Sequence, residues 1–134
     1  SENLRQALAI FTNSDTDQEK WDAEQYILHC DLINDLHKMA TKGIGATNAN
    51  FTRLTDLVSK HLPVIYSHIT KSEYGLSDRE ILVCILIRLL FLPSEIATLL
   101  SCSKQIVSNT RTNINRKLFH QEGTKSLDSN IRHL

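Results

Sequence analysis

The strongest constraint on the fold lies in the middle of the chain, where a helix-start signal precedes an apolar run. Ser77 is followed three residues later by Glu80, which is the spacing of a capping box. The run Ile81–Leu92 follows directly and is broken only by Arg88. The pattern predicts a helix over about 78–90. At roughly 100° per residue its apolar side chains leave no broad polar face, so other elements must cover it on several sides.

Turn signals divide the rest of the chain into further helices. Glycine and proline stand where helix-period patterns stop, and strand signals are nearly absent, with no Asn-Gly or Asp-Gly hairpin turn. We therefore predict an all-α protein. The expected helices cover about residues 2–11, 17–40, 51–62, 63–73, 78–90, 93–100 and 104–119, with one or two turns over 127–134. Polar residues Asn13–Thr16 separate the first two, Asn48 or Asn50 caps the third, and Ser103 caps the helix over 104–119.

Charge is balanced overall but unevenly placed. The 134 residues contain fifteen basic and fifteen acidic side chains, so the net charge does not identify a polyanionic partner. Residues 1–75 hold seven bases and ten acids, whereas residues 76–134 hold eight bases and five acids. The C-terminal half is therefore the part that we expect to meet a polyanion.

Cysteine usage and the apolar run bear on the cellular location. The chain has three cysteines, an odd number, and they are widely spaced: Cys30, Cys84 and Cys102. This pattern fits reduced thiols in a cytoplasmic protein. The run Ile81–Leu92 is too short to span a bilayer, so we expect no membrane contact by this segment. Because the chain begins with Ser1, we interpret it as a fragment or a chain with a tag scar, and a fragment would follow an upstream sensor domain.

The candidate functional feature is a helix-turn-helix pattern. The expected helices over 93–100 and 104–119 are separated by the short turn Leu100–Ser103. On the second helix an inward arc holds Ile106, Val107, Thr110, Ile114 and Leu118. The opposite arc is polar, and no acidic residue occurs between Lys104 and Phe119. This acid-free outer face is the observation on which the functional prediction depends.

The polar side chains of this helix suit duplex DNA. Amides and guanidinium groups form paired hydrogen bonds with purine edges, while hydroxyls and cations bind phosphate. A helix without carboxylates also avoids repulsion from the charged DNA backbone. We predict that five residues face the bases: Gln105, Ser108, Asn109, Thr112 and Asn115. We predict that five others hold phosphate: Ser103, Lys104, Arg111, Arg116 and Lys117.

Three segments resemble the LuxR-type DNA-binding domain. Leu76–Glu80 is similar to the Leu-Thr-x-Arg-Glu opening of that family, Ser94–Ala97 to its Glu-Ile-Ala second helix, and Asn113–Leu118 to its Arg-Lys-Leu ending. Order and spacing agree over about Leu76–Phe119, roughly a third of the chain. The resemblance implies a four-helix module without a wing that docks its third helix, here residues 104–119, in the major groove.

A looser similarity extends the resemblance and two departures limit it. Back to about Leu28, the chain is also similar to the C-terminal regions of larger bacterial regulators, in which such a region follows sensor or tetratricopeptide parts. Sigma-factor region four shares the helix-turn-helix. Ser108 stands where LuxR-type proteins typically have a groove-facing lysine, and Arg111 stands where a core aliphatic is usual. The family's base contacts therefore do not carry over at Ser108, and the preferred DNA sequence stays open.

Catalytic and metal-binding patterns are not found. His29 and His37 lie eight residues apart on one expected helix rather than the four that would place two ligands on one face. The chain has no glycine-rich phosphate loop, no Gly-x-Ser-x-Gly and no His-Glu-x-x-His. We predict a protein that is not an enzyme and has neither a cofactor nor a metal.

The helix expected over 17–40 carries an apolar stripe. Its members are Trp21, Leu28, Leu32, Leu36 and Met39. We expect this stripe to pack on the helix over 78–90, with homodimer formation as a second role, because paired DNA-binding modules read two half-sites about one helical turn apart.

Together these observations predict a helical region over 1–62 and a LuxR-like helix-turn-helix domain over 63–134. The predicted function is that of a cytoplasmic bacterial transcriptional regulator that binds double-stranded DNA. The alternative is a helical protein-interaction or dimerisation module with a vestigial helix-turn-helix, which the zero net charge and the missing groove lysine favour.

Overall fold

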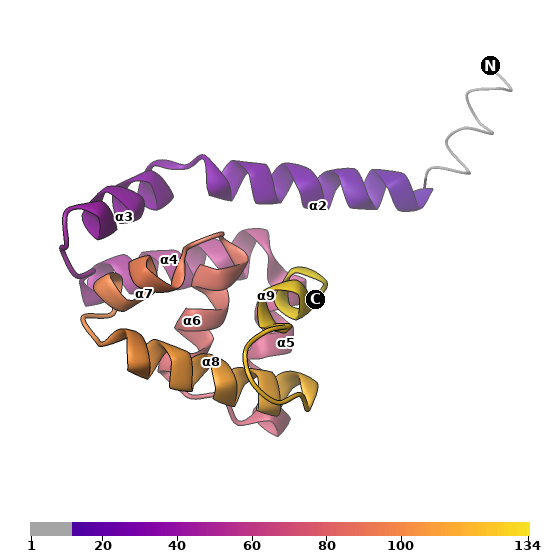
Figure 1. The fold of residues 1–134 in the computed structure, drawn as a ribbon. Coiled ribbons are helices and arrows are strands. Elements are labelled where there is room, and N and C mark those ends of the chain that lie inside the picture. Colours follow the sequence, from indigo (N-terminus) through magenta and orange to yellow (C-terminus); the bar gives the residue numbers. More distant parts are fainter. Residues whose placement is uncertain (1–11) are drawn as a thin grey trace, which may run out of the picture.

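A computed structural model describes residues 12–134, and every regular element in that range is a helix (Figure 1). The all-α prediction is therefore confirmed for this part of the chain, while the helix expected over 2–11 lies outside it. The elements are α2 (Thr12–Leu28), α3 (Asp31–Thr41), α4 (Asn48–His61), α5 (Pro63–Ile69), the short 3₁₀ helix η1 (Ser72–Tyr74), α6 (Asp78–Arg88), α7 (Pro93–Leu99), α8 (Lys104–Phe119) and α9 (Leu127–Arg132).

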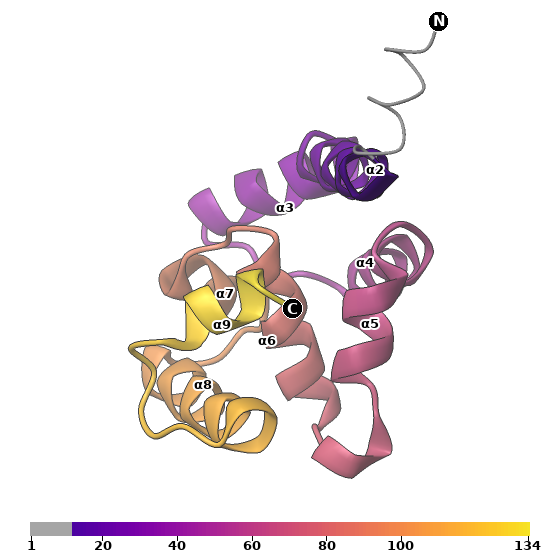
Figure 2. The same ribbon diagram turned by 90° about the vertical axis from the view of Figure 1, so that its right-hand side faces the viewer.

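Helix α6 lies at the centre of the molecule, as its sequence requires. The Ser77 hydroxyl accepts a hydrogen bond from the Glu80 N–H at 3.2 Å, and the Glu80 carboxylate accepts one from the Ser77 N–H at 2.8 Å, so the predicted capping box is present. Every residue from Val83 to Leu89 is buried. Helices α4, α7, α8 and α9 all pack against α6, which confirms that it is covered on several sides (Figure 2).

One hydrophobic cluster holds the described helices together. It contains residues from both sides of the expected boundary at 62/63, including Ile33 and Leu54 before it and Leu86, Ile114 and Ile131 after it. The helices before the boundary therefore contribute directly to the core around α6. The described part of the N-terminal helical region, residues 12–62, therefore packs on residues 63–134.

The prediction of a single helix over 17–40 is wrong. The chain forms α2 and α3 instead, with a break at His29–Cys30, where Cys30 is extended and stands as the N-cap of α3. Residues 13–16, expected to interrupt the helix, lie within α2. The physical reason is tertiary, because α2 packs against α4 whereas α3 packs against α7, and one straight helix cannot follow both.

The apolar stripe of this region is divided in the same way. Leu32 and Leu36 are buried in the core, but Trp21 is 55% exposed on α2. The stripe expected to pack as a unit on the helix over 78–90 is therefore not continuous. Leu28 of α2 and Met39 of α3 are partly buried against the core, and α3 packs chiefly on α7.

Candidate nucleic-acid interface

Helices α7 and α8 are joined by the turn Leu100–Ser103, here called the α7–α8 turn. Its backbone is closed by a hydrogen bond from the Cys102 N–H to the Ala97 carbonyl at 3.0 Å, and Ser101 adopts a left-handed conformation with φ 53°. The Ser103 hydroxyl accepts from the Ile106 N–H at 3.1 Å. Ser103 therefore caps α8, as its sequence position predicts.

Four of the predicted groove-facing side chains lie on the outer side of α8. Gln105, Ser108 and Asn109 are exposed and Thr112 is half-buried. The Gln105 amide donates to the Asn109 side-chain oxygen at 2.9 Å, so the two amides are aligned one turn apart. Both views show α8 at the periphery of the molecule, with α6 and α9 on its inner side (Figures 1 and 2).

Two further residues lie on this outer side, although the polar arc predicted from the sequence does not include them. Asn113 is exposed beside the predicted residues. Ile106, expected to point inward, is 38% exposed in the first turn of α8, so that expectation is wrong. We define the α8 face as Lys104, Gln105, Ile106, Ser108, Asn109, Thr112, Asn113 and Arg116. Its exposed side chains are amides, hydroxyls, two cations and one aliphatic group.

Asn115 does not face outward, and its assignment to the bases is wrong. It is 0% exposed, and its amide donates to the Gly123 carbonyl at 3.1 Å and to the Ser126 hydroxyl at 3.2 Å. Its oxygen accepts from the Asn130 amide on α9 at 3.1 Å. A buried amide is stable only when it is hydrogen-bonded, and the segment after α8 supplies these partners. Asn115 therefore joins α8 to the α9 segment.

Arg111 is likewise used inside the protein, which corrects its assignment to phosphate. It is 9% exposed, and its guanidinium lies 3.0 Å from the Asp128 carboxylate on α9. The resemblance places a core aliphatic at this position, and Arg111 does occupy an inward one. Its charge is matched within the chain by Asp128.

Lys117 ties α8 to the start of α6, so it is also not a free phosphate ligand. Its ammonium lies 2.7 Å from the Glu80 carboxylate and donates to the Gly75 carbonyl at 3.2 Å. Burial raises the pKa of Glu80, but the hydrogen bonds from Lys117 and Ser77 and the charge of Lys117 outweigh it, so the pKa of Glu80 lies below its ordinary value. Glu80 is therefore ionised at neutral pH and forms an ion pair with Lys117.

Two of the predicted phosphate ligands keep exposed charges. Lys104 is exposed in the first turn of α8, and Arg116 is 56% exposed near its end, with its guanidinium 3.7 Å from the exposed Glu122 carboxylate. An ion pair at that distance in solvent is weak. Lys104 and Arg116 are thus the cations that the α8 face presents to solvent.

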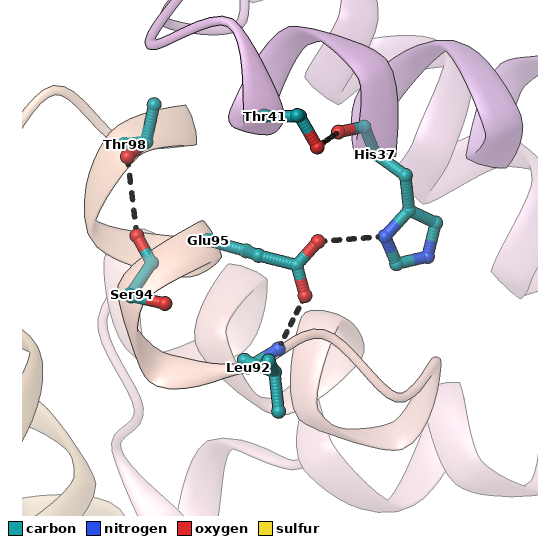
Figure 3. Close-up of polar contacts among 6 residues, drawn as sticks. All are labelled: His37, Thr41, Leu92, Ser94, Glu95 and Thr98. Carbon is teal, nitrogen blue, oxygen red and sulfur yellow. Dashed lines mark hydrogen bonds and ion pairs between the residues drawn. The ribbon is translucent and has the colours of Figure 1, made fainter.

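Helix α7 also packs against α3 (Figure 3). His37 stacks on Phe91 with ring centroids 4.0 Å apart, and its Nδ1 lies 2.8 Å from the Glu95 carboxylate. The second oxygen of Glu95 accepts from the Leu92 N–H at 2.9 Å and so caps α7. The same carboxylate therefore fixes the start of α7 and its contact with α3.

Other kinds of site are not formed by the described residues. Among the side chains that the structure describes, those of residues 18, 19 and 21–134, no three His, Cys, Asp or Glu lie close enough together to hold a metal ion. Over residues 12–134, each helix is too short or too polar to cross a membrane. Comparison of the chain with models of known protein families, with curated proteins and with solved structures finds no match.

Proposed function

We propose that this chain binds duplex DNA through the α8 face and acts as a bacterial transcriptional regulator of the LuxR-like type. The observation that supports the proposal most directly is that the α8 face carries amides, hydroxyls and cations in a stretch without a carboxylate. Gln105 and Asn109 are suited to base edges, and Lys104 and Arg116 to phosphates. Ile106 adds an aliphatic group of the kind that contacts the methyl group of thymine.

The internal contacts of α8 support the same proposal in a different way. Arg111, Asn115 and Lys117 hold the inner side of the helix on α9 and α6. A helix held at several points keeps its outer side chains in one arrangement, and such rigidity favours specific contacts. We further propose a cytoplasmic location and a two-fold pair of chains that reads two half-sites.

The test is a fluorescence-polarisation titration of labelled duplexes over a range of salt concentrations, after selection of bound sequences from random duplexes. Asn109→Ala is expected to relax the preference at one base pair by about 1–3 kcal/mol, because it removes a paired contact. Arg116→Ala is expected to weaken all duplexes alike and to lower the slope of log K against log salt by about one.

Two variants serve as matched controls for this experiment. Asn34→Ala removes an exposed amide from α3, and Lys60→Ala removes an exposed cation from the last turn of α4. Neither is expected to change affinity or salt dependence. Absence of salt-dependent binding at high micromolar wild-type protein would contradict the proposal.

A second candidate is a protein-interaction module, and the exposure of Ile106 and Leu92 favours it. Under that alternative the α8 face binds a protein surface, and the helix-turn-helix is vestigial. The same titration distinguishes the two, because a protein-binding module has no reason to bind duplexes with a salt-dependent affinity.

A further inference from the structure

The loop between α3 and α4, residues 42–47, rests on the α7–α8 turn. The Ala46 N–H donates to the Leu99 carbonyl at 2.9 Å. Gly45 approaches the turn so closely that a Cβ at this position would lie 2.2 Å from the Ser101 hydroxyl oxygen. Segments more than fifty residues apart in the sequence therefore meet immediately before the first turn of α8, and both lie at the same end of the molecule (Figure 1).

This contact joins the two longest acid-free stretches of the described chain. Residues 36–55 contain no Asp or Glu, and neither do residues 96–121, although the protein has fifteen acidic residues. The nearest carboxylate on α7 is that of Glu95, and both of its oxygens are engaged, by His37 and by the Leu92 N–H. The loop and the first turns of α8 therefore carry few negative charges, which lowers the repulsion that an approaching polyanion meets there. At the other end of the α8 face, the carboxylate of Glu122 lies 3.7 Å from Arg116.

Lys42 is the cation that the loop adds to this surface. It is exposed at the C-cap of α3, and it forms no ion pair with the described side chains, those of residues 18, 19 and 21–134. Asp35, the nearest acid before it on α3, lies two turns away, or about 10 Å along the helix axis. The charge of Lys42 is therefore available to an external partner.

We propose that the α3–α4 loop is a second DNA contact, in which Lys42 holds a backbone phosphate next to the base pairs that meet the α8 face. The inference rests on the proposed function and deepens it. A phosphate is the expected ligand because Lys42 is a single cation on a flexible side chain and lies outside the helix that meets the bases. The α3–α4 loop then helps to orient α8 in the groove and does not itself select sequence.

The test is a salt series with the full chain and with Lys42→Gln, on both the selected duplex and a scrambled one. Loss of one phosphate contact is expected to lower the slope of log K against log salt by about 0.9. The affinities for the two duplexes are expected to fall by the same factor. Lys42→Arg is expected to keep the wild-type slope, and Lys60→Gln, which removes an exposed cation from α4, is expected to leave it unchanged.

The outcomes separate this inference from the proposed function. If the wild type binds DNA and Arg116→Ala weakens it, an unchanged slope for Lys42→Gln overturns the loop contact alone. A fall confined to the selected duplex also overturns it, because that result indicates base recognition. If the wild type shows no salt-dependent binding, the proposed function is wrong, and the loop contact that rests on it is wrong as well. Circular dichroism of each variant verifies that the fold is retained.

Discussion

Glu80 shows how one side chain can serve two helices. Its carboxylate accepts the Ser77 N–H at the start of α6 and also the ammonium group of Lys117 on α8. Although the residue is buried, these donors stabilise its charged form, and the net result is a lowered pKa. Glu80 therefore stabilises the fold most where it is ionised.

Glu80→Gln is predicted to lower the free energy of unfolding by about 1–2 kcal/mol at pH 7, because charge-assisted hydrogen bonds become neutral ones. A lowered folded-state pKa contributes stability above the unfolded value of 4.5, and that contribution is lost as pH falls through the folded value. The difference between wild type and variant should therefore shrink below about pH 4.5. Urea denaturation between pH 3 and 7 measures it.

Glu73→Gln is the control, because Glu73 is an exposed carboxylate in η1. It should leave the free energy of unfolding nearly unchanged at every pH. A wild-type advantage over Glu80→Gln that persists undiminished at pH 3 would contradict the role assigned to the Glu80 charge.

At the scale of elements, the contact between α3 and α7 combines a ring stack with a shared carboxylate. His37 lies against Phe91, which immediately precedes α7. Its ring also meets the carboxylate of Glu95, which caps α7 through the Leu92 N–H (Figure 3). The α3–α4 loop meets the C-terminal end of α7 through the Ala46–Leu99 hydrogen bond. Helix α7 is thus held at both of its ends by the region before α4.

A double-mutant cycle of His37→Ala and Glu95→Ala is predicted to give a coupling of about 0.5–1 kcal/mol in the free energy of unfolding. The value is modest because both side chains are partly exposed to solvent. The control cycle pairs His37→Ala with Thr98→Ala, since the Thr98 hydroxyl donates to the Ser94 carbonyl of its own helix. Equal couplings in the two cycles would show that His37 and Glu95 do not interact.

At the scale of the whole molecule, the core does not divide where the sequence suggested a boundary. Leu54 and Val58 of α4 belong to the same cluster as the buried residues of α6, and Ile33 and Leu36 of α3 belong to it too. A domain over 63–134 alone would expose these contacts to water. The burial of one large aliphatic side chain is worth about 1.5–3 kcal/mol, and the overall stability of a small domain is only about 5–15 kcal/mol.

The fragment 63–134 is therefore predicted to lose the cooperative unfolding transition of the full chain while keeping part of its helix content. Urea denaturation followed by far-ultraviolet circular dichroism measures both properties. A fragment that unfolds at the same urea concentration as the full chain, and as steeply, would show that residues 63–134 form an independent domain.

Several helix starts were predictable because their signals are local, but the start of α4 was not. Thr47 caps α4, and the expected caps Asn48 and Asn50 lie within its first turn. Ser77 with Glu80 and Ser103 cap the helices that they were expected to cap, and Pro63 and Pro93 stand at first helical positions. The bounds of α8 match the expectation at both ends. The α8 face was predictable to the extent that helical periodicity decides which side chains share a side.

The inward position of Arg111 had a signal in the sequence, whereas that of Asn115 did not. Arg111 follows Val107 by four residues and precedes Ile114 by three, so it lies at the edge of the apolar arc although its charge favours the outside. Asn115 lies seven residues after the exposed Ser108, about 20° from it around the helix, so periodicity placed it on the polar side. Its burial is decided by its partners Gly123, Ser126 and Asn130 in the segment after α8.

The helical class, the starts of α5, α6, α7 and α8 and the central burial of α6 follow from the sequence, since these depend on neighbouring residues and on the run of apolar side chains. Which polar residues are buried depends on long-range contacts instead, because the partners of Arg111, Asn115 and Lys117 lie in other elements, at Asp128, Asn130 and Glu80. The break at Cys30 was decided in the same way, by the separate surfaces of α4 and α7. Local signals set where a helix forms, and long-range contacts set which of its faces meets water.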